Sequence, residues 1–397
     1  MTDAVTLLCI ATYFKGEDFL RECRRLGATV LLLTADTLAG AAWPRDAVHE
    51  IHTIPRDASE ARVRGVVAAI ARQHRIDRVV ALDDFDVETA AMLREFLQVP
   101  GFGRTVGAHF RDKLAMRTAA RHLGLAVPEF TAVFNDRIVD EWAARVPPPW
   151  VLKPRSSAAA TGIRKIDRRE HLAAALEAAA DDRPHCLLEQ FVRGDVYHVD
   201  SIVRNASVVF EVVSKYGRPP MQIAHEGGVF VTRRIAAQSP EAAGFIAMNR
   251  RLLTGFGLID GVSHSEFIHG PAGVTFLETS ARVGGAYIVE VVEAATGVNL
   301  WREWARLEIA GEQGDYESPP ARSDSAGIVL CLARQEAPDL SSYTDPEIVL
   351  RIRRPHHAGL IVRSSEPGRV EHLLHEYADR FARDFLATLP APDRPLA

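Results

Sequence analysis

Short apolar segments alternate with amphipathic segments over the first hundred residues, and this alternation limits the available folds more than any other feature of the chain. The apolar segments are predicted strands and the amphipathic ones predicted helices: 6–11, 29–33, 48–54 and 78–82 for strands, and 17–26, 61–71 and 88–97 for helices. Strands that alternate with helices form a parallel sheet covered on both faces. The sequence therefore predicts an α/β fold. No G-x-G-x-x-G follows the first strand, so the dinucleotide-binding fingerprint is absent there.

The rest of the chain is predicted to mix strands and helices, with two breaks in the pattern. A Gly-rich segment at 100–107 is a predicted linker, and a polar segment rich in Pro and Ser at 311–325 is a predicted boundary. The strand pattern is interrupted by predicted helices that end at 123 or cover about 168–180, 240–255, 287–309 and 370–386.

Composition argues against several classes of protein. The chain has 397 residues, enough for two or three domains of about 150 residues. Its 47 basic and 52 acidic residues give a net charge of −5, so we expect neither a nucleic-acid partner nor an anionic membrane surface. No apolar stretch approaches the ~18 residues of a membrane span. Because its four cysteines form no C-x-x-C pair, we expect reduced thiols and a cytoplasmic location.

A lysine-bearing strand and a loop of small residues follow one another at Val151–Gly162. The strand delivers Lys153, and the loop contains Ser156, Ser157 and three alanines. Such a loop can bring backbone N–H groups close to phosphate oxygens, and the lysine adds a point charge. It is not a Walker A loop, because the lysine comes first and a strand follows. Taken alone, an ordinary Ala/Ser-rich surface loop is the better interpretation.

A second segment, 187–195, is an apolar strand that ends in an acid and a turn. Its residues Glu189, Gln190, Phe191 and Val192 could present backbone groups to an adenine edge, with the Glu189 carboxylate facing the exocyclic amine. The alternative is a strand end with a solvated glutamate, which the segment alone favours.

The strongest local signal is a predicted hairpin over 261–280. A three-residue loop, Pro271-Ala272-Gly273, with Gly273 in the left-handed conformation, pairs Gly270 with Val274. In that register Glu266 faces Glu278, and His264 and Ser280 share their face. Two facing carboxylates repel unless a cation lies between them, and Mg²⁺ binds one or two carboxylates plus phosphates. Arg282 follows at the end of the strand, where its guanidinium can bind a phosphate. Gly284-Gly285 comes two residues later. The alternative is a solvent-facing acidic hairpin; the metal site is favoured because Glu278 follows the apolar run Val274–Leu277.

In this order, the motifs resemble the ATP-grasp superfamily of carboxylate–amine ligases over residues 1 to 310. The resemblance implies that Lys113 and Lys153 hold ATP phosphates, and that the 189–192 segment is the adenine-binding hinge. It implies that Glu266 and Glu278 bind Mg²⁺ and that Arg282 is the phosphate-binding arginine of an E-x-N-x-R element, in which Ser280 replaces the asparagine. Lys153 and Arg282 are the expected catalytic residues. A ribose-binding glutamate has no counterpart at Val196, so Asp195 or Asp200 is expected to replace it.

The resemblance also implies the domain organisation. We expect a Rossmann-like domain at 1–105, a two-lobed ATP-grasp domain at 106–310 with a mobile lid at about 128–190, and a C-terminal α+β subdomain at 311–397 that completes the grasp domain. The resemblance to the family is the only basis for expecting a homodimer.

The function that the resemblance implies is ATP-dependent amide formation through an acylphosphate, with release of ADP and phosphate. The expected cofactors are ATP and two Mg²⁺ ions, with Mn²⁺ as an alternative, and the partners are a small-molecule carboxylate and an amine, such as amino acids or related small acids. A kinase of the same superfamily and a non-catalytic nucleotide-binding protein are the alternatives. The candidate substrate-binding residues are Lys215, Arg218, His225, Arg233, His264 and Gly285.

Overall fold

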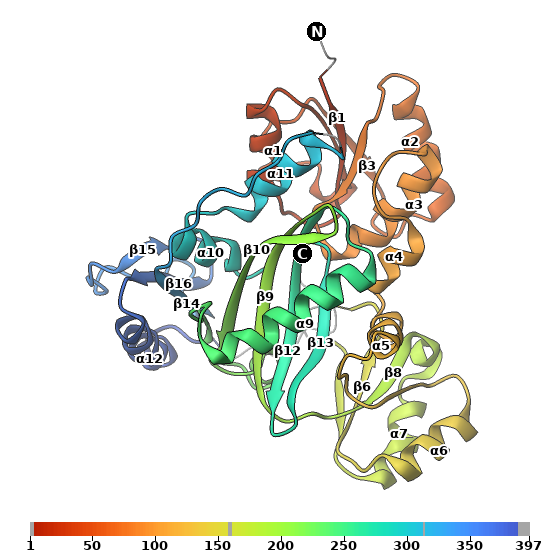
Figure 1. Cartoon of the computed structure of the whole chain (residues 1–397), viewed down its shortest axis with the longest axis vertical. Coiled ribbons are helices and arrows are strands. Elements are labelled where there is room, and N and C mark those ends of the chain that lie inside the picture. Colours follow the sequence, from red (N-terminus) through yellow and green to blue (C-terminus); the bar gives the residue numbers. More distant parts are fainter. Residues whose placement is uncertain (1–3, 158–160, 313, 388–397) are drawn as a thin grey trace.

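The computed structural model describes residues 4–157, 161–312 and 314–387, and it arranges them around three sheets (Figure 1). The first is a four-stranded parallel sheet in the order β3-β2-β1-β4. Leu8 of β1 faces Leu31 of β2 on one side and Val79 of β4 on the other. The predicted parallel sheet is therefore confirmed, with the strands β1 (Thr6–Ala11), β2 (Thr29–Ala35), β3 (Glu50–Ile54) and β4 (Arg78–Ala81).

Helices cover both faces of this sheet, as the near-continuous apolar strands require. Side chains of β1 and β2 that point to one face pack against α2 (Glu60–Ala71) and α3 (Val87–Leu97). Those on the other face pack against α1 (Glu17–Arg25) and α11 (Leu300–Ala310), which lie side by side in Figure 1. A helix from far along the chain thus completes the N-terminal core.

The second sheet has eight antiparallel strands in the order β13-β12-β9-β10-β11-β14-β16-β15. Helix α9 (Pro240–Phe256) packs against β9, β10 and β13, α10 (Ile288–Thr296) against β11, β14 and β16, and α12 (Pro367–Asp384) against β11, β14 and β16 (Figure 1). The C-terminal strands extend this sheet rather than form one of their own. The strands are β9 (Asp195–Arg204), β10 (Ser207–Tyr216), β11 (Phe230–Arg234), β12 (Gly261–Gly270), β13 (Gly273–Ser280), β14 (Ser325–Leu332), β15 (Ile348–Arg351) and β16 (His357–Ser364).

The third sheet is small and carries the loop of the predicted lid. Its order is β5-β8-β6-β7, and α6 (Asp136–Arg145) and α7 (Leu172–Glu177) cover it around a core centred on Trp142 and Trp150. It occupies one end of the molecule in Figure 1. The strands are β5 (Phe130–Ala132), β6 (Trp150–Pro154), β7 (Arg164–Ile166) and β8 (Cys186–Gln190). The predicted lid coincides with this sheet; the domain bounds themselves stay predictions.

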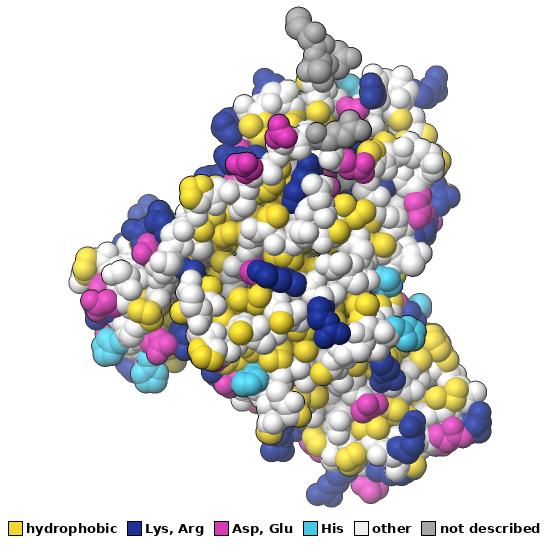
Figure 2. Space-filling model, in the orientation of Figure 1, with side chains coloured by type: hydrophobic (Ala, Val, Ile, Leu, Met, Phe, Trp, Pro, Cys, Tyr) yellow, Lys and Arg dark blue, Asp and Glu magenta, His cyan; other side chains and the backbone are white. Residues whose placement is uncertain are grey.

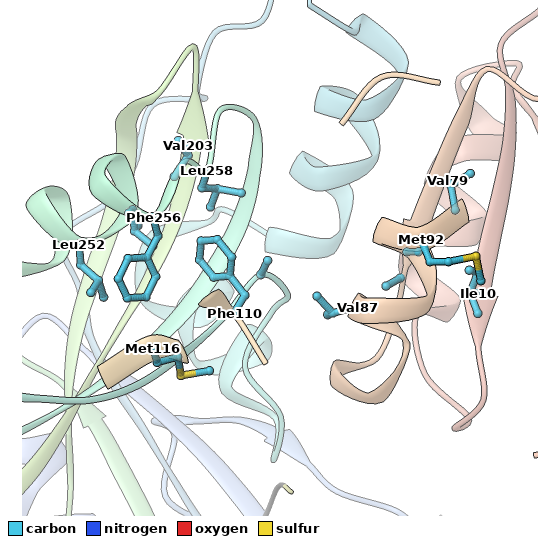
Figure 3. Packing of buried hydrophobic residues seen from close by; sticks show 14 of the residues in the cluster. Ile10, Val79, Val87, Met92, Phe110, Met116, Val203, Leu252, Phe256 and Leu258 are labelled. Atoms are coloured by element: carbon cyan, nitrogen blue, oxygen red, sulfur yellow. The ribbon is translucent and has the colours of Figure 1, made fainter. Parts of the chain in front are cut away.

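One buried core joins the N-terminal sheet to the large sheet. Phe110 packs edge-on against Phe256 of α9, near Met116 of α5 (Lys113–His122), while Val87 of α3 lies between this group and Ile10 of β1 (Figure 3). Phe110 is fully buried in the short connection between α4 (Arg104–His109) and α5. Its packing joins the core of the N-terminal sheet to that of the large sheet.

Several predictions about local structure were wrong. The predicted linker 100–107 contains the start of a helix, α4 (Arg104–His109), and the helix predicted at 168–180 shortens to α7. Helix α6 and the short helix α8 (Pro220–Glu226) were not predicted, although the buried Val139, Trp142 and Ala143 of α6 have the i, i+3, i+4 spacing of a helix face.

The hairpin turn also differs from the prediction. Gly273 has φ +97°, as predicted, but Gly270 faces Gly273 rather than Val274. The register then shifts between Glu266 and Phe267, because Leu277 forms a bulge. The bulge restores the predicted pairing of Glu266 with Glu278.

The surface carries both signs of charge, and the view in Figure 2 shows Lys and Arg interspersed with Asp and Glu. Among the residues described, no helix has the length and apolar character needed to cross a membrane. The four cysteines, Cys9, Cys23, Cys186 and Cys331, are buried free thiols. Burial raises the pKa of the Cys331 thiol to about 12, so it stays protonated and unreactive at neutral pH.

Replacing Phe110 tests the interdomain core. We expect Phe110→Ala to lower the free energy of unfolding by about 3–5 kcal/mol, because it leaves a cavity among packed aromatic rings. Phe96→Ala is the control, since Phe96 is 45% exposed. Urea unfolding followed by circular dichroism measures both; equal midpoints for the two variants would contradict the packing described.

Candidate active site

A cavity of about 830 Å³ lies between the small sheet and the large sheet, with Lys15 and Asp84 of the N-terminal domain at its edge. Most of the residues singled out from the sequence line it. These are Lys113, Lys153, Ser157, Glu189, Gln190, Phe191, Val192, His225, His264, Glu266, Glu278, Ser280, Arg282 and Gly285.

The two glutamates predicted to face each other do so on neighbouring strands. Glu266 of β12 is paired in register with Glu278 of β13. The Glu278 carboxylate contacts the Lys113 ammonium at 3.2 Å, and the Tyr216 hydroxyl donates to Glu266 Oε1 at 2.8 Å. Burial opposes the ionisation of Glu278, but Lys113 and Lys153 outweigh it and lower its pKa to about 2. Glu278 is therefore an ionised acceptor at neutral pH.

A buried ion cluster holds the second lysine. Lys153 is paired with Glu189, whose other oxygen accepts from Arg117 Nε at 3.0 Å. All three side chains are nearly or fully buried. Burial lowers the pKa of Lys153 to about 8 against the attraction of Glu189. The pKa of Glu189 is lowered, because the attraction of Arg117 and Lys153 outweighs its burial.

An acid from the N-terminal domain reaches the end of the glutamate hairpin. Asp84 follows β4, and its Oδ1 accepts from the Ser280 hydroxyl at 2.5 Å and lies 3.8 Å from Arg282 Nε. Its Oδ2 accepts from Arg111 at 2.9 Å. Asp84 thus ties the predicted phosphate-binding arginine to the N-terminal sheet.

A chain of imidazoles and carboxylates runs beside the glutamate pair. Asp200 is fully buried and accepts from His264 Nδ1 at 2.8 Å and from His198 Nδ1 at 2.6 Å. The ligand atoms of these three residues lie within 4.8 Å of one another. Burial opposes the ionisation of Asp200, but the two imidazoles lower its pKa. Despite its burial, His264 has a pKa raised to about 9, mainly by Asp200.

Two family models match parts of this chain. The ATP-grasp N-terminal domain matches residues 20–101, and the ATP-grasp domain matches residues 110–231. The chain belongs to the ATP-grasp family. Members of this family bind ATP with Mg²⁺.

Named relatives of this ATP-grasp chain include an L-amino acid ligase and a carnosine synthase. The L-arginine-specific L-amino acid ligase of Bacillus subtilis is 21% identical over 62% of this chain and 61% of its own length. Carnosine synthase 1 of Mus musculus is 26% identical over 54% of this chain and 27% of its own length. This chain thus aligns with less than two thirds of either relative. The crystal structure of an L-amino acid ligase from Bacillus licheniformis has the same fold, with a TM-score of 0.76, 18% identity, and coverage of 97% of this chain and 99% of that one.

The segment predicted to be the adenine-binding hinge differs from expectation at one side chain. The Glu189 carboxylate was predicted to face the adenine amine, but Lys153 and Arg117 occupy both of its oxygens. A buried carboxylate between two cations is held by them. Gln190, Phe191 and Val192 line the cavity, but the N–H groups of Gln190 and Phe191 already donate to the carbonyls of Glu129 and Pro149.

Six of the predicted site residues lie outside the cavity wall: Ser156, Asp195, Asp200, Lys215, Arg218 and Arg233. Asp200 is enclosed by histidines, so a ribose contact is excluded by its burial, while Asp195 pairs with Lys215 at 2.6 Å. Lys215 alternates with the cavity-lining Tyr216 along β10 and so points to the opposite face. Arg233 is paired in register with Lys215, so it shares that face, and it forms an ion pair with Glu371 of α12. Arg218 pairs at 2.8 Å with Glu226, which does line the cavity.

The small-residue loop is described only in part. Ser156 and Ser157 contribute backbone carbonyls: Ser156 accepts from Arg111, and Ser157 accepts from Lys113 Nζ at 2.6 Å. The alanines Ala158, Ala159 and Ala160, predicted to lie near phosphate, are outside the described residues.

Sequence reasoning missed Asp84, Arg111, Arg117 and Tyr216. A signal existed for Asp84, because side chains at the carboxyl ends of parallel strands face a ligand crevice. Arg117 lies four residues after Lys113 and so shares its helix face, but arginine is too abundant in this chain to attract notice.

Removing the charge of Glu189 tests the buried ion cluster. We expect Glu189→Gln to lower the free energy of unfolding by about 3–5 kcal/mol, because Lys153 and Arg117 then lack a counter-ion in the interior. The matched control is Glu129→Gln, since Glu129 also pairs with an arginine but is 60% exposed. Chemical denaturation measures the free energy of unfolding of both variants. If Glu189→Gln loses no more of it than Glu129→Gln, the buried ion cluster is refuted.

Proposed function

We propose that this protein is an ATP-dependent carboxylate–amine ligase that joins amino acids or related small acids. The observation that carries the proposal is the pairing of Glu266 with Glu278 across two strands, inside one cavity with Lys113, Lys153 and Arg282. Acidic ligands for a metal and basic ligands for phosphates are thus brought to one place. Such a site suits phosphoryl transfer, in which the protein mainly positions groups and neutralises charge.

The donor set fits a hard divalent cation. Glu266 and Glu278 offer carboxylate oxygens, and the Ser280 hydroxyl donates its hydrogen to Asp84, so its oxygen lone pairs stay available. Mg²⁺ favours such oxygen ligands. Two Mg²⁺ ions held here, or Mn²⁺ in their place, would neutralise charge on the ATP phosphates.

The protein's own residues have distinct proposed tasks. Lys113 and Lys153 attract the phosphates, and Arg282, oriented by Asp84, holds the phosphoryl group that is transferred. The substrate carboxylate attacks the γ-phosphorus, the bond to the β-phosphate oxygen breaks, and ADP leaves. The amine then attacks the acylphosphate carbon, phosphate leaves, and the amine loses a proton. Exclusion of water protects the acylphosphate.

The substrate class is proposed from the relatives' names and from the cavity. Beyond the predicted phosphate region the wall contains Tyr216, His225, Phe230 and Ala286, a mixture suited to a small acid with an apolar part. His225, His264 and Gly285 remain the predicted substrate residues at this wall. We place the reaction in the cytoplasm, in agreement with four free cysteines. A homodimer stays a prediction.

An isotope experiment tests the reaction. Amino acids labelled with ¹⁸O in the carboxylate are incubated in pools with ATP and Mg²⁺, and products are followed by mass spectrometry. We expect ADP, an amide, and one ¹⁸O atom in the released phosphate, because the acylphosphate oxygen leaves with phosphorus. A phosphorylated product would indicate the kinase, and no ADP from any pool would indicate a nucleotide-binding protein. Glu278→Ala is the inactive control.

The pKa of Lys153 predicts a pH dependence of nucleotide affinity. Because burial lowers this pKa to about 8, the ammonium is charged below pH 8 and loses its proton as the pH rises further. We expect ADP to bind roughly 3–10-fold more weakly at pH 9 than at pH 7. Lys153→Arg stays charged and is expected to remove this slope. Isothermal titration calorimetry in EDTA measures both, and parallel slopes would contradict a phosphate role for Lys153.

A further inference from the structure

Polar side chains form two rows across three neighbouring strands, on the face that carries the glutamate pair. Each row contains one residue from β13, one from β12 and one from β9, in register. On β12 and on β9, an imidazole in one row lies next to a carboxylate in the other row. The first row is Ser280, His264 and Asp200, and the second is Glu278, Glu266 and His198.

The β9 end of this array is fixed from several sides. Asp200 accepts one hydrogen bond at each carboxylate oxygen, from His264 Nδ1 and from His198 Nδ1. His198 is held at its other nitrogen, Nε2, by the Thr232 hydroxyl at 2.8 Å. Because a carboxylate only accepts, both Nδ1 atoms carry hydrogens. This fixes the ring orientation of His264.

The fixed ring presents its second nitrogen to the proposed metal ligand. His264 Nε2 lies 3.6 Å from Glu266 Oε1, and the Tyr216 hydroxyl donates to the same oxygen at 2.8 Å. Tyr216 is itself buried and packs against the His198 ring, with centroids 4.8 Å apart. Oε1 thus accepts a hydrogen bond from Tyr216 and lies within ion-pair distance of His264, and the other oxygen, Oε2, is the one we assign to the metal.

We propose that His264, held by Asp200 and His198, is a positioning residue that orients the Glu266 carboxylate toward the divalent ion. The inference rests on the metal role proposed for Glu266. Groups that orient a metal ligand commonly change metal affinity by about 10–100-fold when they are removed. His264 and His198 both donate their Nδ1 hydrogens to Asp200. We therefore expect His264 to act on the metal through the Glu266 carboxylate.

Mn²⁺ binding to the full-length protein saturated with ADP, followed by electron paramagnetic resonance, tests this role without turnover. We expect His264→Gln and Asp200→Asn each to weaken Mn²⁺ binding about 10–100-fold. Affinity for ADP in EDTA is expected to stay unchanged. His269→Gln is the matched control, because His269 is an exposed histidine on the same strand, outside the cavity wall.

A double-variant cycle separates positioning from general loss of structure. If His264 acts through Glu266, adding His264→Gln to Glu266→Gln changes Mn²⁺ affinity by no more than about 2-fold. If the losses of Mn²⁺ affinity caused by His264→Gln and by Glu266→Gln multiply in the double variant, the proposal is overturned. Wild-type Mn²⁺ affinity in His264→Gln would also overturn it. If Asp200→Asn does not fold, the His264 and Glu266 double-variant cycle alone tests the positioning role.

Two further outcomes are distinguishable. Unchanged Mn²⁺ affinity in Glu266→Gln itself refutes the metal role of Glu266 and therefore the inference with it. Mn²⁺ that still binds stoichiometrically in a Glu266→Gln, Glu278→Gln variant, but not in Asp200→Asn, places the ion on the histidine cluster and overturns the positioning role.

Discussion

The pairing of two carboxylates on adjacent strands is the constraint around which the site is arranged. Glu266 and Glu278 share one face of one hairpin, where their charges repel unless cations surround them. Lys113 and Lys153 supply that compensation from a helix start and from the small sheet. Because these cations come from different parts of the fold, α5 and the small sheet must keep their positions against the hairpin for Glu278 to remain ionised.

The same charges explain why so many polar groups are buried here. Lys153 needs Glu189, Glu189 also takes Arg117, and Arg282 and Arg111 share Asp84. Each buried charge has an opposite partner, which is the condition under which burial is tolerated. Asp84 and Arg111 extend this network to the N-terminal sheet, which thereby supplies a carboxylate 3.8 Å from the arginine proposed to hold the phosphoryl group.

The sequence predicted those parts of the fold that depend on local pattern. The parallel N-terminal sheet followed from apolar runs alternating with amphipathic stretches, and the hairpin followed from a Gly/Pro turn between two strands. The facing of Glu266 and Glu278 was predicted from a three-residue turn, yet it arises through a different turn pairing corrected by a bulge at Leu277. A bulge depends on packing against neighbouring strands, and its position cannot be read from the turn alone.

Tertiary contacts decided what could not be predicted. Lys215 and Arg233 have suitable chemistry, but strand alternation turns them away from the cavity, toward Asp195 and Glu371. Glu189 stands in the predicted hinge, while its partner Arg117 comes from a helix more than seventy residues earlier. A single sequence reveals which residue types are present, whereas the partner that neutralises each one depends on the assembled fold.

Diffraction from crystals grown with Mn²⁺ and a non-hydrolysable ATP analogue tests the central claim most directly. The account predicts an anomalous manganese peak between Glu266 and Glu278, bridged to the triphosphate, with Lys113 and Lys153 at the phosphate oxygens. Manganese on the histidine cluster, a triphosphate bound elsewhere, or the two glutamates bound to no ion would contradict it.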